Sequence, residues 1–212
     1  MSRFPILFVC TLLLACSGTF PSGTTQYEGP RGTAAVATGA EEPADLGLTL
    51  YRDPRSRGEV QKFYAGVAGD DELGRIILLQ ANAYDIPLPL AFALAWGESQ
   101  FNPRAFNRNP QSVDRGLFQL NSRTFPHLKT DDFYDPRINA HLGMRHLRFC
   151  LNAGQNELVG LAIYNAGSLK VRGRGTPYNT LHHIAKILDY RQKLEEEFTR
   201  ALLKHPGMVS VL

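Results

Sequence analysis

Glu98 is the residue of this chain best placed for acid–base chemistry. It follows the apolar residues 92–97, and this pattern places it near the carboxyl end of a buried helix. Burial and the negative end of the helix dipole both disfavour an ionised carboxylate, so we predict a raised pKa for Glu98. A carboxyl group that keeps its proton near neutral pH can donate it to a leaving oxygen, which is general acid catalysis.

Three short runs after Glu98 supply amide, hydroxyl and aromatic side chains that could line a cleft around it. They are residues 116–122, 135–139 and 164–167. An Asn-Pro pair at 102–103 stops the helix soon after Glu98, because the residue before a proline disfavours helical geometry. The carboxyl group is therefore expected where a helix gives way to a loop.

The elements that position these residues are predicted to be helices. Apolar residues recur at spacings of three and four, and no run alternates strictly enough to predict a strand. One predicted helix ends near Tyr84, and a second covers 88–98. A third runs from Asp135-Pro136 to about Gly154, and two more cover 157–164 and 181–203. The fold class is therefore mainly α.

The helix that starts at Asp135-Pro136 has a clear signal, with the aspartate as N-cap and the proline at the first helical position. Its predicted core stripe consists of Ile138, Leu142, Met144, Leu147 and Leu151. Cys150 on the same helix is predicted to be a small buried hydrophobe and not a nucleophile, because the sequence suggests no histidine partner for it.

These motifs resemble, in order and spacing, those of the soluble-type lytic transglycosylase catalytic domain, over roughly residues 70–170. The matching segments are Glu98-Ser99 with residues 101–105, Gly116-Leu117-Phe118-Gln119, Asp135-Pro136 with Asn139 and Gly143, and residues 162–167. Residues 114–122 are also similar to a loop of animal lysozymes. The resemblance implies a lysozyme-like helical domain that cleaves the β-1,4 bond between N-acetylmuramic acid and N-acetylglucosamine in peptidoglycan.

The resemblance also implies residue roles. Glu98 would be the catalytic acid and base, Phe118 and Gln119 would line the sugar cleft, and Tyr164 would bond near the Glu98 carboxyl group. The implied substrate-binding residues are Ser99, Gly116, Phe118, Gln119, Tyr164 and Asn165. The resemblance calls for no cofactor and no metal, and peptidoglycan glycan strands are the implied partner.

The sequence departs from the family pattern at two places. Phe118 stands where many members have methionine, a volume-tolerant apolar exchange. The segment 176–183 keeps the last family motif poorly and has His183 where a tyrosine is expected, so substrate contacts from the final helix are not predicted. The pair His182-His183 is interpreted as an exposed helix start and not a metal site, since adjacent helical residues point to different faces.

Two alternatives to the transglycosylase remain open at the level of sequence. Hydrolases generally need a second carboxylate near the acid, and Asp114 alone stands beside a cleft motif. A lysozyme-type muramidase would therefore use Asp114. A transglycosylase needs one carboxylate, because the sugar's own 6-hydroxyl captures the reactive centre. A glycan-binding lipoprotein without activity is the third reading, although the presence of Glu98 argues against it.

The amino terminus predicts export. Arg3 and the apolar residues 4–14 are typical of a signal peptide and too short to span a bilayer. Residues 13–16, Leu-Leu-Ala-Cys, resemble the bacterial lipobox, which predicts cleavage before an acylated Cys16. An ordinary secretory signal with a chance cysteine is the alternative. Acylation would give a lipid-anchored protein of the bacterial cell envelope, with its catalytic domain in the periplasm.

The domain boundaries follow from composition. We predict a signal peptide over 1–15, an acylated cysteine and flexible linker over 16–58, and the catalytic domain over 59–212, since the segment after Cys16 is rich in Gly, Thr, Ser, Pro and Ala. The modest net charge of +3 argues against a nucleic-acid partner. The one dense basic segment, around Lys170, Arg172 and Arg174, is interpreted as a solvated loop. The sequence does not reveal which protein partners the chain has.

Overall fold

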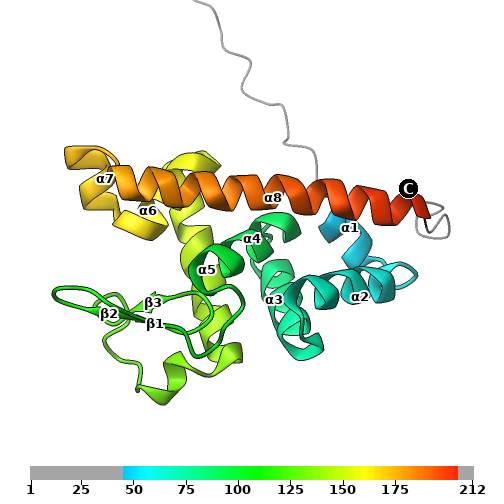
Figure 1. The fold of residues 1–212 in the computed structure, drawn as a ribbon, viewed down its shortest axis with the longest axis horizontal. Coiled ribbons are helices and arrows are strands. Elements are labelled where there is room, and N and C mark those ends of the chain that lie inside the picture. Colours follow the sequence, from blue (N-terminus) through cyan, green and yellow to red (C-terminus); the bar gives the residue numbers. More distant parts are fainter. Residues whose placement is uncertain (1–44, 205–212) are drawn as a thin grey trace, which may run out of the picture. The chain divides into compact units, whose positions relative to one another are not determined.

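The computed structural model of the chain describes residues 45–204. The predicted signal peptide, Cys16 and the linker up to residue 44 lie outside the described residues. Within 45–204 the fold is mainly helical, as predicted, with eight α-helices and a small sheet (Figure 1). The elements are α1 Leu46–Arg52, α2 Arg57–Ala68, α3 Asp71–Ala83, α4 Leu88–Ser99, β1 Phe106–Arg108, β2 Val113–Arg115, β3 Leu120–Asn121, the 3-10 helix η1 Asp131–Phe133, α5 Pro136–Gly154, α6 Glu157–Ala166, α7 Ser168–Arg174 and α8 Tyr178–Lys204.

The helical domain begins earlier than residue 59, so the predicted linker boundary at 58 is wrong. Asp45 caps α1 by accepting a hydrogen bond from the Leu48 backbone N–H at 2.7 Å, and the same oxygen lies 3.3 Å from the backbone nitrogen of Leu88 at the start of α4. Leu50 of α1 is fully buried in the common core. A helix of seven residues is too short for its periodicity to stand out from a polar, small-residue segment.

Helix α4 forms the centre of the core. Its first eight residues, 88–95, are all buried, because a helix that is apolar all round is stable only when neighbours cover every face. Helices α1, α3 and α8 supply these neighbours. In Figure 1 α8 runs across the molecule above α4 and α6. The packing fixes the carboxyl end of α4, where Glu98 lies.

Helix α5 starts as predicted, with Asp135 as N-cap and Pro136 at the first position. The predicted core stripe is correct for Met144 and Leu147, which are fully buried, and wrong for Ile138, which is 36% exposed. At the start of α5, Asn139 is buried in place of Ile138. A polar residue at a core position is tolerated only where its hydrogen bonds are satisfied.

A three-stranded antiparallel sheet follows α4, although no strand was predicted. Its order is β1-β2-β3, and Asp114 is paired with Asn107 on one side and Asn121 on the other. The strands have three, three and two residues. Strands of this length are too short to show an alternating pattern, because alternation is recognised over four or more residues.

Two further elements differ from the sequence predictions. Residues 168–174, interpreted as a basic loop, form the short helix α7. Helix α8 starts at Tyr178, three residues before the predicted residue 181. This earlier start places His183 well inside a helix. Within residues 45–204 no helix is both long enough and apolar enough to cross a membrane.

Candidate active site

Glu98 lies in the last turn of α4, as predicted, and its side chain is 10% exposed. The helix ends directly afterwards, because Gln100 and Phe101 both adopt left-handed backbone angles, with φ of 53° and 62°. Such angles are unfavourable for residues with a side chain and are held in place by surrounding contacts. The carboxyl group therefore sits at a sharp change of chain direction, on the wall of a cleft of about 680 Å³.

The pKa of Glu98 is raised, in the predicted direction. Burial is the main cause, and the negative charge of Asp114 acts in the same sense. His183 opposes both through a hydrogen bond and its charge. A buried carboxyl group with a raised pKa holds its proton to higher pH and can act as a general acid.

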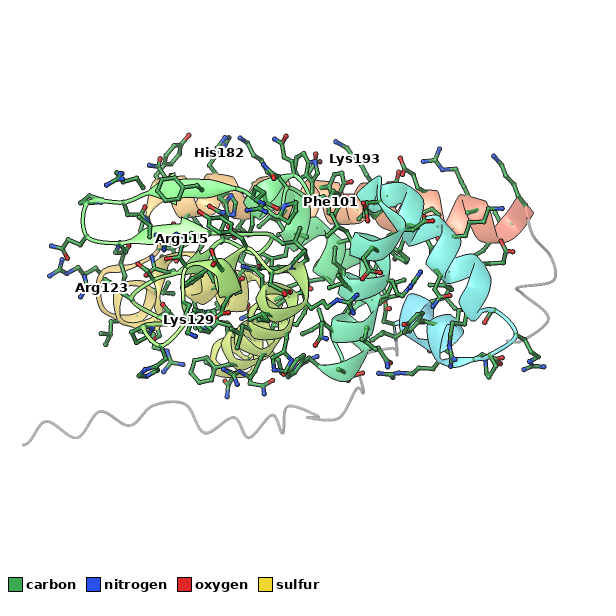
Figure 2. All side chains as sticks on the ribbon, turned by 90° about the horizontal axis from the view of Figure 1, so that it is seen from below. Phe101, Arg115, Arg123, Lys129, His182 and Lys193 are labelled. Atoms are coloured by element: carbon green, nitrogen blue, oxygen red, sulfur yellow. The ribbon has the colours of Figure 1, made fainter. Side chains whose placement is uncertain are left out.

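His183 is the site residue that the sequence analysis missed. Its Nε2 lies 3.2 Å from Glu98 Oε1, although the two residues are 85 positions apart. The neighbouring His182 is exposed and projects outward from α8 (Figure 2). The predicted exposed helix start is therefore correct for His182 and wrong for His183. One signal in the sequence could have indicated this role, because His183 stands where the family pattern has a tyrosine.

The loop at 116–119 forms a second wall of the cleft. Gly116 has φ of +80°, and a Cβ there would lie 2.1 Å from the Phe133 carbonyl oxygen and 2.2 Å from Asn139 Nδ2. Only glycine therefore fits at this turn. Gly116 is buried and serves the packing of the loop, so the structure gives it no exposed surface for a substrate.

Asn139 of α5 holds this loop in place through hydrogen bonds. Its Oδ1 accepts the backbone N–H of Phe118 at 2.8 Å, while its Nδ2 donates to the carbonyl oxygens of Phe133 at 2.7 Å and Arg115 at 3.0 Å. The side chain is completely buried. These bonds connect α5 to the backbone of β2, η1 and the 116–119 loop, so Asn139 organises the cleft wall without lining it.

Phe118 does not line the cleft, contrary to the implied role. The side chain is fully buried and packs against Gly143 of α5, where a Cβ would lie 2.7 Å from Phe118 Cβ. Its aromatic ring fills the space between the loop and α5. The contribution of Phe118 to the cleft is made through its backbone, which bonds to Asn139 and Tyr164.

Gln119, Tyr164 and Asn165 do line the cleft. Gln119 has φ of 45° and its Nε2 donates to the Gly116 carbonyl oxygen at 3.0 Å. The Tyr164 hydroxyl donates to the Phe118 carbonyl oxygen at 2.9 Å, so it braces the loop, where the resemblance implied a bond near the Glu98 carboxyl group. Burial, followed by the charge of Glu98, raises the pKa of Tyr164 well above its usual range, which keeps the phenol protonated.

Ser99 ties the end of α4 to the same loop. Its Oγ lies 2.7 Å from the Leu117 carbonyl oxygen and 3.1 Å from that of Ala95. The one hydroxyl proton is used inside the protein, and Ser99 does not line the cleft. Ser99 thus positions the loop relative to Glu98, whereas the resemblance implied a substrate contact.

Asp114 faces the same cleft from the sheet, and its carboxylate is held by three asparagine side chains. Oδ1 accepts from Asn121 Nδ2 at 2.6 Å, and Oδ2 accepts from Asn109 Nδ2 at 2.7 Å and Asn107 Nδ2 at 3.2 Å. These bonds join all three strands and the β1–β2 turn. Asp114 therefore holds the sheet together at the edge of the cleft.

Comparison with known proteins agrees with this geometry. Residues 75–183 match the model of the family described as the transglycosylase SLT domain. The chain belongs to this family. No curated protein and no solved structure matches the chain.

The matched part of the transglycosylase SLT domain runs from α3 into the first turns of α8 and includes every cleft residue named above. Membership confirms the resemblance seen in the sequence and supports a peptidoglycan-acting, lytic-transglycosylase-like function. His183 is the last residue of the match. His183, which departs from the family pattern, is therefore in direct contact with Glu98.

The cleft of this SLT domain is also lined by aromatic side chains. Phe125, His146 and Phe149 line it, and Lys170 of α7 is also part of the lining. His146 Nε2 lies 3.7 Å from Cys150 Sγ, so the cysteine does have a histidine neighbour, contrary to the expectation from sequence. Cys150 is nevertheless fully buried, and burial raises the pKa of its thiol to about 12, which leaves it protonated and unreactive.

Among residues 45–204 no group of three or more His, Cys, Asp or Glu side chains is arranged to hold a metal ion. What the described cleft offers a ligand is a buried carboxyl group, several side-chain amides and several aromatic side chains. Side-chain amides and aromatic rings suit the hydroxyl, acetamido and ring faces of a sugar chain.

Proposed function

We propose that the protein is a peptidoglycan lytic transglycosylase, a glycosidic bond lyase. It cleaves the β-1,4 bond between N-acetylmuramic acid and N-acetylglucosamine and leaves 1,6-anhydromuramic ends. The observation that carries the proposal is the buried Glu98 carboxyl group, whose pKa is raised and which faces a cleft lined by amide side chains. Family membership supports the class of reaction.

The proposed reaction uses Glu98 twice. First the protonated carboxyl donates its proton to the glycosidic oxygen, and the bond between this oxygen and the anomeric carbon of the muramic residue breaks. The carboxylate that remains then takes the proton of the 6-hydroxyl, while the 6-oxygen attacks the anomeric carbon and closes the anhydro ring. Glu98 is protonated again at the end, and no water is consumed.

The bonding of Asp114 favours this mechanism over hydrolysis. A hydrolase needs a second carboxylate with an oxygen free to attack the sugar or to activate water. Both Asp114 oxygens instead accept side-chain amide hydrogens, which favours a role in holding the sheet. The muramidase alternative rests on the fact that Asp114 and Glu98 line the same cleft.

We propose that glycan strands bind along the amide-lined walls made by the sheet, the 116–119 loop and the end of α6. The side chains that would contact the sugars are Asn107, Asn109, Gln119, Asn121 and Asn165. Amides can both donate to and accept from the hydroxyl and acetamido groups of the sugar chain. A glycan-binding protein without activity would also need these walls, but it would not need the buried carboxyl group of Glu98.

We further propose that acylation of Cys16 anchors the protein to a membrane of the bacterial envelope and places the domain in the periplasm. This rests on the sequence alone, because Cys16 lies outside the described residues. Several acyl chains, at ~0.8 kcal/mol per buried methylene, would hold the protein in lipid.

Digestion of purified peptidoglycan tests the enzymatic proposal. A cleared band in a peptidoglycan gel distinguishes an enzyme from a binding protein. Mass spectrometry of the released muropeptides then identifies the reaction. Anhydro products, lighter by one water than reducing-end products, are expected, and reducing-end products would support the muramidase.

A further inference from the structure

The contact between Glu98 and His183 is the one side-chain bond made by the proposed catalytic acid within the described residues. His183 Nε2 lies 3.2 Å from Glu98 Oε1, and the two side chains are 24% and 10% exposed. One carboxyl oxygen, Oε1, is therefore occupied by the imidazole. The other, Oε2, has no hydrogen-bond partner in the described part of the chain.

The packing of α8 on α4 determines this contact. A Cβ on Gly97, next to Glu98, would lie 2.5 Å from Ile187 Cγ1 and 3.7 Å from His183 Cε1. The glycine thus lets α8 approach α4 at the level of the acid. Thr180, one turn before His183, donates to Asn165 Oδ1 at 2.8 Å and fixes the same turn of α8 to α6.

The charged and titratable groups around the pair come from four elements. Glu98 belongs to α4, Asp114 to β2, Tyr164 to α6, and His183 and Lys186 to α8. The hydrogen bond to Glu98 raises the pKa of His183, and burial and Lys186 oppose this rise. Burial and Asp114 raise the pKa of Glu98, and His183 opposes them. Two groups in such contact titrate as a coupled pair.

We propose that His183 is a positioning residue that shares one proton with Glu98 and so sets the pH range in which Glu98 is an acid. The neutral imidazole donates its Nε2 hydrogen to Oε1, which leaves the carboxyl proton on Oε2, the oxygen available to the glycosidic bond. The imidazolium instead forms an ion pair in which Glu98 stays ionised and inactive as an acid. The inference rests on the function proposed above, since it assigns Glu98 the acid's role.

The sharing has a definite kinetic consequence. As pH falls, the pair of Glu98 and His183 gains one proton, which resides mainly on the imidazole. Once most molecules hold this proton, the fraction with protonated Glu98 stops rising. The wild-type rate then levels off at the pKa of the pair. With a residue at position 183 that donates a hydrogen bond but does not titrate, the rate should rise by about tenfold for each unit by which pH falls, until Glu98 itself is protonated.

The test compares pH–rate profiles of the wild type, His183→Gln, His183→Phe and the matched control His182→Gln. The control should follow the wild type, because His182 is exposed. In His183→Gln the alkaline limb should move to lower pH and the acid plateau should exceed that of the wild type. His183→Phe, without a donor, should lose about tenfold or more in kcat with little change in KM. A His183→Gln profile that coincides with the wild type would overturn the proposal.

An NMR titration of the His183 imidazole decides the pairing without using activity. In Glu98→Gln its pKa should be lower than in the wild type, because the carboxylate that stabilises the imidazolium is gone. An unchanged imidazole pKa refutes the pairing. This titration uses only proteins that keep His183, so it decides the question even if the His183 variants do not fold. If this shift is found but the wild type digests no peptidoglycan, the proposed function fails and the pairing stands.

Discussion

Asn139 and Phe118 are joined by a buried hydrogen bond in which the backbone N–H of Phe118 donates to Asn139 Oδ1 at 2.8 Å. Through this bond the first turn of α5 holds the loop that carries Gln119. The amide hydrogens of Asn139 bind the carbonyl oxygens of Phe133 and Arg115. One side chain thus forms hydrogen bonds with three backbone groups.

Replacement of Asn139 by leucine should therefore destabilise the protein. Each buried backbone group left without a partner costs about 1–3 kcal/mol, so a loss of about 3 kcal/mol or more in the free energy of unfolding is expected. Denaturant titration measures it. Asn152→Leu is the matched control, because Asn152 is exposed on the same helix, and its change should stay within about 0.5 kcal/mol. Equal effects of the two substitutions would contradict the bracing role.

Replacement of Glu98 by glutamine should abolish activity and keep the fold. Glutamine is nearly isosteric but has no acidic proton, so a loss of about 10²-fold or more in rate is expected. Peptidoglycan digestion by the purified variant measures the rate. Glu59→Gln, at an exposed position on α2, should digest at the wild-type rate. A fully active Glu98→Gln variant shows that Glu98 is not the acid.

The raised pKa of Glu98 also predicts how stability depends on pH. Because the folded state binds this proton more tightly than the unfolded chain, the stabilisation is complete below the unfolded pKa and is lost as pH rises through the folded pKa. Glutamine does not titrate. The Tm of Glu98→Gln relative to the wild type should therefore increase as pH rises across this window and then stay constant. A difference that decreases with rising pH would show that the folded-state pKa is lowered.

Replacement of Asp114 by asparagine distinguishes the two reactions. If Asp114 only holds the sheet, the variant should still release anhydro products, with KM raised and kcat within about tenfold of the wild type, because the sheet wall is loosened while the acid is intact. A hydrolase would lose its nucleophile or base and its rate would collapse. Product masses and kinetic constants are measured together. An inactive variant of an enzyme that makes reducing-end products establishes the muramidase.

Replacement of Cys16 by alanine should prevent acylation and move the protein from the membrane fraction to the soluble fraction. Cell fractionation and metabolic labelling with a fatty acid measure the change. Cys10→Ala, a substitution in the same amino-terminal segment, should leave both unchanged. If the Cys16 variant stays with the membrane, the anchor is a different part of the protein.

Much of the fold and the setting of the Glu98 carboxyl group could be predicted from sequence, because their signals are local. The apolar run before Glu98 indicates both a buried helix and a carboxyl group in an apolar setting, and the structure confirms helix α4 and the direction of the pKa shift. The Asp-Pro pair at 135–136 marks the start of α5 by its own capping geometry. Spacing along the chain suffices for such features.

Other features depended on contacts between distant segments, which no local pattern reports. Phe118 stands in the cleft motif, yet Gly143 makes room for its ring in the core and only its backbone reaches the site. Tyr164 lines the cleft, and its hydroxyl donates to the backbone carbonyl oxygen of Phe118, 46 residues earlier in the chain. His183 follows Glu98 by 85 residues, and only the close packing of α8 against Gly97 brings its imidazole to the acid. The sequence alone therefore determined most of the long helices and the place of the Glu98 carboxyl group at the end of α4, whereas tertiary packing decided which side chains meet this group.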